Sequence, residues 1–175
     1  MARNATTHAA RPQVKRASRA VQASAAGDTW RHDNIGRLLN AAVRRFEARV
    51  IELMVAAGYA QARISHLSLT RNLDRTGTRV TELAQRSAMT KQAMGELVEQ
   101  CAELGLVERR PDPADGRARI VTFTRIGLKW LEDCRTAVVQ AEAEMSEDIG
   151  SRQLGLIKDA LKRYGVSHTS LGRSE

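Results

Sequence analysis

Polar side chains that can contact a nucleic acid gather at the start of one short segment of predicted helix. Thr90, Lys91 and Gln92 open this segment, and Gly95 follows one turn later. A glutamine can pair with an adenine edge, a lysine can reach a guanine or a phosphate, and a threonine can hold the DNA backbone while it caps the helix. These residue types at a helix start predict an element that meets DNA.

A second set of candidate contacts lies on a predicted strand further along the chain. Arg117 and Arg119 share strand parity with Val121 and Phe123, so the strand is cationic near its tip and apolar near the protein body. An Asp-Gly pair and two prolines just before Arg117 predict a turn. The expected first strand, turn and second strand of this β-hairpin are 106–110, 111–116 and 117–123.

Two short helices joined by a tight turn must position the first set. Thr81 is predicted to cap the first helix, which ends near Ser87. Thr90 is predicted to cap the second, which Gly105 ends. A helix pair followed by a basic hairpin is typical of a winged helix, whose second helix lies in the major groove and whose wing touches a neighbouring minor groove. The expected buried face of the second helix holds Met94, Leu97, Cys101 and Leu104.

Three short motifs give the chain a resemblance to a known family. They are Leu104-Gly105-Leu106-Val107-Glu108-Arg109, Asp112-Pro113-Ala114-Asp115-Gly116-Arg117, and Thr122-Phe123-Thr124 with Gly127. Over roughly 33–164, the sequence resembles MarR-type transcriptional regulators. The resemblance implies that Arg117 enters the minor groove and that Asp115 helps to orient it. Taken without the helix pair, however, an Asp-Gly turn is an ordinary hairpin tip and an exposed arginine is usually solvated.

Long amphipathic helices are expected on both sides of the winged helix, which makes the fold mainly α with a small β-hairpin (α+β). A short strand near Thr78 is expected to add to the wing sheet. The flanking helices are predicted at 33–58, 60–73, 124–150 and 152–164, with Gly165 as a C-cap and with Leu128, Leu131, Cys134, Val138, Ala141 and Met145 on one apolar face.

The first and last of these helices display more aliphatic surface than one compact winged helix needs. They are therefore predicted to interleave with a second copy in a homodimer, and the resemblance implies the same helices. The alternative is that the apolar faces of these helices pack only within one chain. The predicted organisation is a disordered basic tail (1–28), an N-terminal dimerisation helix (29–58), the winged helix-turn-helix (59–124), C-terminal helices (125–166) and a mobile end (167–175).

Net charge supports a polyanionic partner. The 175 residues carry a formal charge of +8, which favours double-stranded DNA. The first 27 residues hold five basic side chains and no acidic one, so this tail is either an arm that grazes DNA or an inert extension. Its composition resembles an organellar transit peptide, but a MarR-like protein is expected in a bacterial or archaeal cytoplasm. No apolar stretch suits a signal peptide or a membrane partner.

Catalytic and metal chemistry find little support in the sequence. There is no phosphate-binding glycine loop, nucleophile elbow or carboxylate pair beyond turn chemistry at Asp112 and Asp115, so neither an enzyme nor a cofactor is predicted. Cys101 and Cys134 are interpreted as structural thiols rather than redox switches. The four histidines lack the spacing of a metal site: His8, His32, His66 and His168. The remaining alternatives are an architectural or RNA-binding protein and a dimerisation module.

The resemblance also implies an effector. MarR-like proteins often bind small anionic aromatic compounds between the dimerisation helices and the winged helix. Trp30 can stack on a ring, Arg37 or Arg109 can pair with a carboxylate, and Ser65 and His66 lie beside each other on one helix. Each residue also has an alternative role: Trp30 staples the helix start, Arg109 contacts the DNA backbone, and His66 is a satisfied interior histidine. The predicted function is a repressor released by such a ligand, with an activator of the same fold as the alternative.

Overall fold

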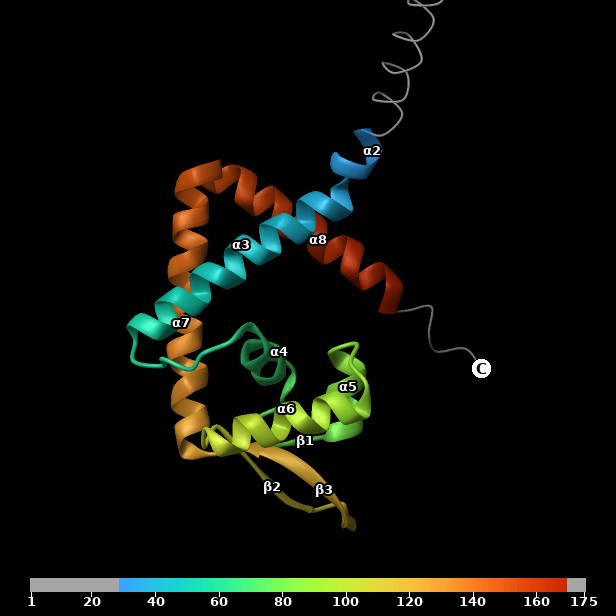
Figure 1. Ribbon diagram of the computed structural model, residues 1–175. Helices are drawn as coiled ribbons and strands as arrows, with labels where there is room; N and C mark the ends of the chain where they lie inside the picture. Colours follow the sequence, from blue (N-terminus) through green and yellow to red (C-terminus); the bar gives the residue numbers. More distant parts are fainter. Residues whose placement is uncertain (1–28, 170–175) are drawn as a thin grey trace, which may run out of the picture. The chain divides into compact units, whose positions relative to one another are not determined.

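The computed structural model describes residues 29–169 (Figure 1). The chain forms two compact units, divided between Arg45 and Phe46. The first unit contains helix α2 (Thr29–His32) and the beginning of helix α3 (Ile35–Ala56). The predicted arm, with Arg3, Arg11, Lys15, Arg16 and Arg19, lies outside the described residues, as do residues 170–175 of the predicted mobile end 167–175.

The second unit contains the helix-turn-helix and the wing. After α3 it runs through a mainly helical series of elements with one small sheet, so the predicted fold class is confirmed. The sheet is antiparallel in the order β1-β3-β2, and the expected extra strand is β1. The elements are α4 (Ile64–Asn72), β1 (Thr78–Arg79), α5 (Val80–Arg86), α6 (Lys91–Glu103), β2 (Val107–Asp112), β3 (Asp115–Phe123), α7 (Arg125–Ile149) and α8 (Ser151–Thr169).

Threonine side chains cap the starts of α6 and α7. The Thr90 hydroxyl accepts a hydrogen bond from the Ala93 N–H at 3.1 Å, and the Thr124 hydroxyl accepts one from the Gly127 N–H at 3.0 Å. Thr124 also donates to the Gly105 carbonyl, which joins the start of α7 to the end of α6. Both predicted caps are therefore confirmed.

Several predicted boundaries are wrong. Helix α4 begins at Ile64, four residues after the predicted start at 60. Thr81 does not cap α5, because the helix begins one residue earlier at Val80. The hairpin turn is shorter than expected: Pro111 pairs with Arg119 in an edge strand, where a missing N–H is tolerated. Gly165 does not end α8, since its backbone stays helical and the helix continues to Thr169.

The core of the second unit takes one large side chain from nearly every element. The predicted face of α6 is confirmed, because Met94, Leu97 and Cys101 are buried. The predicted stripe of α7 is partly wrong: Leu128 is 42% exposed, while Trp130, absent from that stripe, is buried. The Trp130 ring stands edge to face with Tyr59, at 4.8 Å between centroids, and this contact selects which side of α7 turns inward.

Helix α7 starts against the strand that leads into the wing, and only glycine fits at the contact. A Cβ atom on Gly127 would lie 1.8 Å from the Leu106 carbonyl oxygen and 3.1 Å from Cδ1 of Phe123. The obstacle is backbone, which cannot rotate away. The side-chain volume at residue 127 therefore limits how closely α7 approaches the sheet.

Gly127→Ala should lower the free energy of unfolding by at least about 2 kcal/mol, because overpacking here must displace the Leu106 backbone. Urea titration followed by circular dichroism measures this change. Gly155→Ala, in exposed α8 with no atom within 4 Å of the added Cβ, is the matched control. It should be neutral or stabilising by up to about 1 kcal/mol. Equal unfolding midpoints for Gly127→Ala and the wild type would contradict this account.

Candidate nucleic-acid interface

The first turn of α6 forms an exposed polar surface. Lys91 and Gln92 are exposed directly after the Thr90 cap. A Cβ on Gly95 would meet no atom within 4 Å, so another molecule can approach the backbone closely there. The structure therefore brings all four predicted residues into the first one and a half turns of this helix.

Opposite this surface, α6 is anchored in the core. Met94, Val98 and Cys101 are fully buried, and the helix contacts both α4 and α5. The buried face of α6 therefore holds the exposed polar surface of the helix in place. This surface includes one residue that the sequence interpretation missed: Glu96, whose carboxylate accepts a hydrogen bond from the Gln92 amide at 3.1 Å. The i, i+4 spacing of these two residues is the sequence signal that could have found this pair.

The wing extends beyond the two helices of the helix-turn-helix (Figure 1). Arg117 and Arg119 are exposed on β3, whereas Val121 and Phe123 on the same strand are buried. The predicted division of this strand into a cationic outer half and an apolar inner half is confirmed. The outer half can reach a partner that the protein body does not touch.

Asp115 contacts the backbone of Arg117. Its Oδ1 accepts a hydrogen bond from the backbone N–H of Arg117 at 3.1 Å, and its Oδ2 lies 3.5 Å from a guanidinium nitrogen of Arg79. Asp115 therefore fixes the backbone of Arg117, while its charge faces Arg79. A carboxylate two residues before an N–H favours this local turn bond over a contact with the more distant guanidinium.

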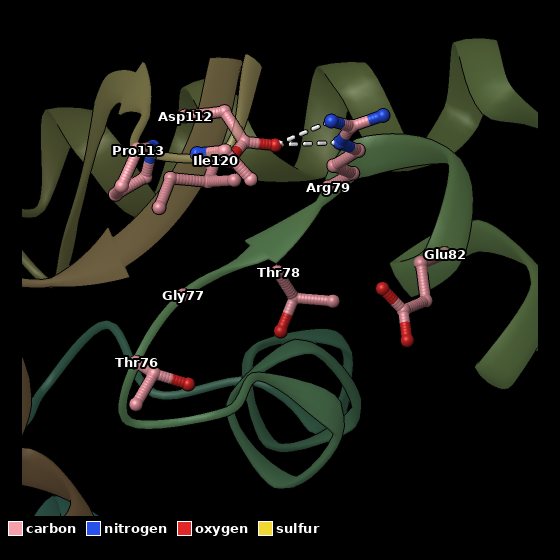
Figure 2. A pocket seen from close by; sticks show the side chains of 9 residues that line it. Thr76, Gly77, Thr78, Arg79, Glu82, Asp112, Pro113 and Ile120 are labelled. Carbon is pink, nitrogen blue, oxygen red and sulfur yellow. Dashed lines mark hydrogen bonds and ion pairs between the residues drawn. The ribbon is translucent and has the colours of Figure 1, made fainter. Parts of the chain in front are cut away.

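A second contact of Arg79 was not predicted. Its Nε and Nη2 atoms lie 2.7 and 2.6 Å from Oδ2 of Asp112, beside a recess of about 330 Å³ (Figure 2). The other oxygen of Asp112 accepts a hydrogen bond from the Ala114 N–H at 2.9 Å. This backbone bond and the Arg79 guanidinium lower the pKa of Asp112, so the carboxylate stays charged.

Arg109, which is predicted to meet a ligand, pairs with α6. Its guanidinium lies 2.8 Å from the Glu99 carboxylate. Arg110, its neighbour on β2, lies 2.6 Å from Glu108. The ion pair of Arg109 therefore joins strand β2 of the wing to the second helix of the helix-turn-helix.

The remaining predicted ligand residues fall into two groups. In the first unit, Trp30 is 68% exposed, and the backbone of exposed Arg37 donates to the Asn34 side chain. In the second unit, Ser65 is exposed and His66 is buried on α4. The structure describes each unit by itself, so it does not join these two groups.

His66 lies in an unusual environment. Its Nδ1 atom and the Nε1 atom of Trp130 are buried without a hydrogen-bond partner, and the two rings stand edge to face at 6.3 Å. Desolvation, and secondarily the charge of Arg63, lowers the pKa of His66. Nearby, the Tyr59 hydroxyl donates to Asp133 at 2.6 Å; burial and this bond raise the pKa of Tyr59 to about 12.

Neither cysteine has the features of a reactive thiol. Cys101 is fully buried, and burial raises its pKa to about 11; burial also raises the pKa of half-buried Cys134. Both side chains therefore favour the protonated form. Among residues 29–169, no three His, Cys, Asp or Glu side chains come together as a metal site, and no helix there is long and apolar enough to cross a bilayer.

Comparison with known proteins identifies the fold. Residues 65–118 match the model of the MarR family. The reduced form of MarR from E. coli aligns with a TM-score of 0.65 and 19% identity, over 75% of this chain and 96% of that one. CouR from Rhodococcus jostii RHA1, bound to p-coumaroyl-CoA, gives 0.61 and 24%, over 75% and 91%. No curated protein matches the sequence.

A third solved structure is also similar. The Mycobacterium tuberculosis MarR family protein Rv2887, in complex with p-aminosalicylic acid, gives a TM-score of 0.60 and 21% identity, over 76% of this chain and 99% of that one. At these identities the structural likeness shows the winged-helix fold, and the family match lies on the helix-turn-helix and the wing.

The buried His66 predicts a pH dependence of stability. Its pKa in the folded protein lies below the ordinary 6.5, so the unfolded chain takes up a proton first as the pH falls. Stability should therefore be complete above about pH 6.5 and decline below it, until the pH passes the lower pKa of the folded state. The pKa of Asp112 is lowered from that of an ordinary aspartate, about 4, so this carboxylate does not contribute to the change in stability just below pH 6.5.

Melting temperatures of the wild type and His66→Gln, at about pH 7.5 and about pH 5.5, measure this effect. The wild type should lose more stability between the two than the variant, which lacks the titrating ring. Equal losses would show that His66 does not carry the dependence.

Proposed function

We propose that this chain, which matches the MarR family and has its winged-helix fold, is a sequence-specific transcriptional regulator that acts in the cytoplasm as a homodimer on DNA. One observation carries the proposal: the exposed start of α6 and the exposed arginines of the wing belong to the same compact unit. A recognition helix and a wing so arranged suit adjacent grooves of a duplex.

The start of α6 supplies the base contacts in this proposal. A major groove about 12 Å wide admits one helix, and the helix start reaches deepest. Gln92 is suited to an adenine edge, and Lys91 to a guanine or a phosphate. Thr90 then anchors the DNA backbone while its hydroxyl caps the helix.

The wing supplies minor-groove contacts. Arg117 and Arg119 carry the charge, and A·T-rich sequence offers a narrow groove with enhanced negative potential. The acidic residues of α6 include Glu96 and Glu99, whereas these two arginines lie on β3. The wing is therefore the stronger source of attraction to DNA.

Exposed apolar side chains support the homodimer. On α8, Leu156, Ile157, Leu161 and Tyr164 are between 40% and 70% exposed. In the first unit, taken by itself, Ile35 and Leu38 are also more than half exposed. Apolar surface of this extent on helix faces indicates an interface. A two-fold dimer would place recognition helices on half-sites about one helical turn, roughly 10 bp, apart.

We further propose that a small aromatic acid releases the regulator from its operator, as a repressor requires. Two structures similar to this chain hold p-coumaroyl-CoA and p-aminosalicylic acid, both of which contain an aromatic ring and a carbonyl group. In this chain, the Nδ1 atom of His66 and the Nε1 atom of Trp130 are buried polar atoms without partners. A ligand carbonyl or carboxylate oxygen can accept a hydrogen bond from the Trp130 Nε1–H, and a polar ligand group can pair with Nδ1 of His66. Trp30, Arg37 and Ser65 stay predicted contributors.

Arg117→Ala should weaken operator binding by about 1–3 kcal/mol and reduce the preference for A·T pairs beside each half-site. The side chain is exposed, so fold and dimer should be preserved. Operators selected from a random duplex library, with substituted flanks, allow anisotropy titrations to measure this. A variant that binds every flank as the wild type does would show that the hairpin is not a DNA-reading wing.

Matched measurements separate the other possibilities. Lys129→Ala removes one cation at an exposed position on α7, where Lys129 pairs with Asp133 2.7 Å away, and should leave flank preference unchanged. Light scattering should report a dimer for the wild type and Arg117→Ala at micromolar concentration. A wild-type monomer without any preferred duplex would contradict the proposed function as a whole.

The effector proposal predicts a change in tryptophan fluorescence. The chain has two tryptophans, so Trp30→Phe leaves Trp130 as the sole emitter. p-Aminosalicylate should change this emission and dissociate the protein from its operator over the same concentration range. In the same background, His66→Leu should weaken the ligand by roughly tenfold, since it removes a buried polar partner. DNA release without a fluorescence change would place the ligand away from Trp130.

A further inference from the structure

We infer that Arg79 is a positioning residue for the wing: paired with Asp112 and Asp115, it latches the hairpin tip to the start of α5 and thereby holds Arg117 in place. We call these three residues the tip latch. The inference rests on the proposed function, because it concerns how Arg117 is presented to DNA. It assigns a role to a cation that the sequence interpretation left out.

The anchored end of the tip latch is rigid. Arg79 is the last residue of β1 and the N-cap of α5, and its backbone pairs with Ile120 in the central strand. The preceding residue, Thr78, is buried and pairs with Val121. The Arg79 side chain therefore starts from a fixed point in both the sheet and the helix-turn-helix.

The other end of the tip latch depends on an irregularity in the hairpin. The register of β2 and β3 shifts between Pro111 and Asp112. Such a bulge re-aims the side chains that follow it. Asp112 is accordingly turned inward, with only 10% of its side chain exposed, while the three residues before it are exposed. In Figure 2 its carboxylate points toward the Arg79 guanidinium.

Each acidic residue of the tip latch also holds the backbone of the turn. Asp112 accepts a hydrogen bond from the Ala114 N–H, and Asp115 accepts one from the Arg117 N–H. The Arg79 guanidinium contacts the second oxygen of both carboxylates, closely for Asp112 and at 3.5 Å for Asp115. A chain of charged contacts thus runs from the start of α5 to the backbone of Arg117.

Little else restrains the tip. All side chains from Pro113 to Arg117 are exposed, so apolar burial does not fix the orientation of the turn. An isolated two-stranded ribbon is only marginally stable in water. The ion pair with Asp112 is therefore the contact that determines where the tip points relative to α5.

A direct phosphate contact is the competing role for Arg79, whose side chain is 46% exposed. Two carboxylates already offset its charge, which weakens its attraction to DNA. The two roles make opposite predictions for Asp112→Asn. This variant keeps an oxygen for the Ala114 N–H but loses the charge that holds Arg79, so it breaks the tip latch while freeing the guanidinium.

The first experiment measures the free protein, and it does not depend on any operator. Backbone ¹⁵N relaxation of Gly116 and Arg117 should show greater mobility in Arg79→Gln, with order parameters falling from about 0.85 toward about 0.6. Arg135→Gln is the matched control: it removes the same group from α7, where Arg135 pairs with Glu132. Unchanged mobility in Arg79→Gln would overturn the inference.

The second experiment is a double-mutant cycle on the selected operator. Arg79→Gln and Asp112→Asn should each weaken binding about threefold to tenfold, and neither should have a comparable effect when Arg117 is already alanine. Full additivity with Arg117→Ala, or Asp112→Asn binding as tightly as the wild type, would overturn the tip latch. If the wild type prefers no duplex, the proposed function fails, and the relaxation measurement alone decides the inference.

Discussion

The pairing of β1 with β3 is the constraint on which the positions of both the helix-turn-helix and the wing depend. Only two residues form this ladder, Thr78 with Val121 and Arg79 with Ile120, yet they connect the start of the helix-turn-helix to the central strand of the wing. The approach requires glycine at position 77, where φ is +100° and a Cβ would lie 2.7 Å from the Ile120 side chain. This short ladder, which needs a glycine for close approach, thus fixes the position of the wing relative to the helix-turn-helix.

Local signals in the sequence were sufficient for most of this architecture. The caps at Thr90 and Thr124 and the apolar face of α6 depend on side chains within one or two helical turns, so a linear pattern contains them. Trp130 and Asp112 could not be placed in this way. The inward side of α7 depends on Tyr59, 71 positions away in sequence, and the role of Asp112 depends on a bulge and on Arg79, which lies 33 residues before it.

Buried polar atoms without partners are the other feature that periodicity did not predict. His66 Nδ1 and Trp130 Nε1 both lie in the core, and leaving such an atom unpaired costs about 1–3 kcal/mol. An apolar residue at position 66 would avoid this penalty. Holding the imidazole neutral, as its lowered pKa favours, limits the penalty without removing it. The two atoms are therefore the places in the core where a polar ligand would gain most.

The charges of α6 and the wing suggest how affinity and specificity are divided. Within α6, Lys91 is the one basic residue, whereas Glu96, Glu99 and Glu103 are acidic. In the proposed complex, a carboxylate near phosphates is repelled unless a base amino group pairs with it, so Glu96 favours some sequences over others. The wing has the opposite role in the proposed complex, because the charges of Arg117 and Arg119 attract any duplex and favour narrow minor grooves. In the proposed complex the wing supplies affinity, and the acidic helix can discriminate only if the wing is held in register with it.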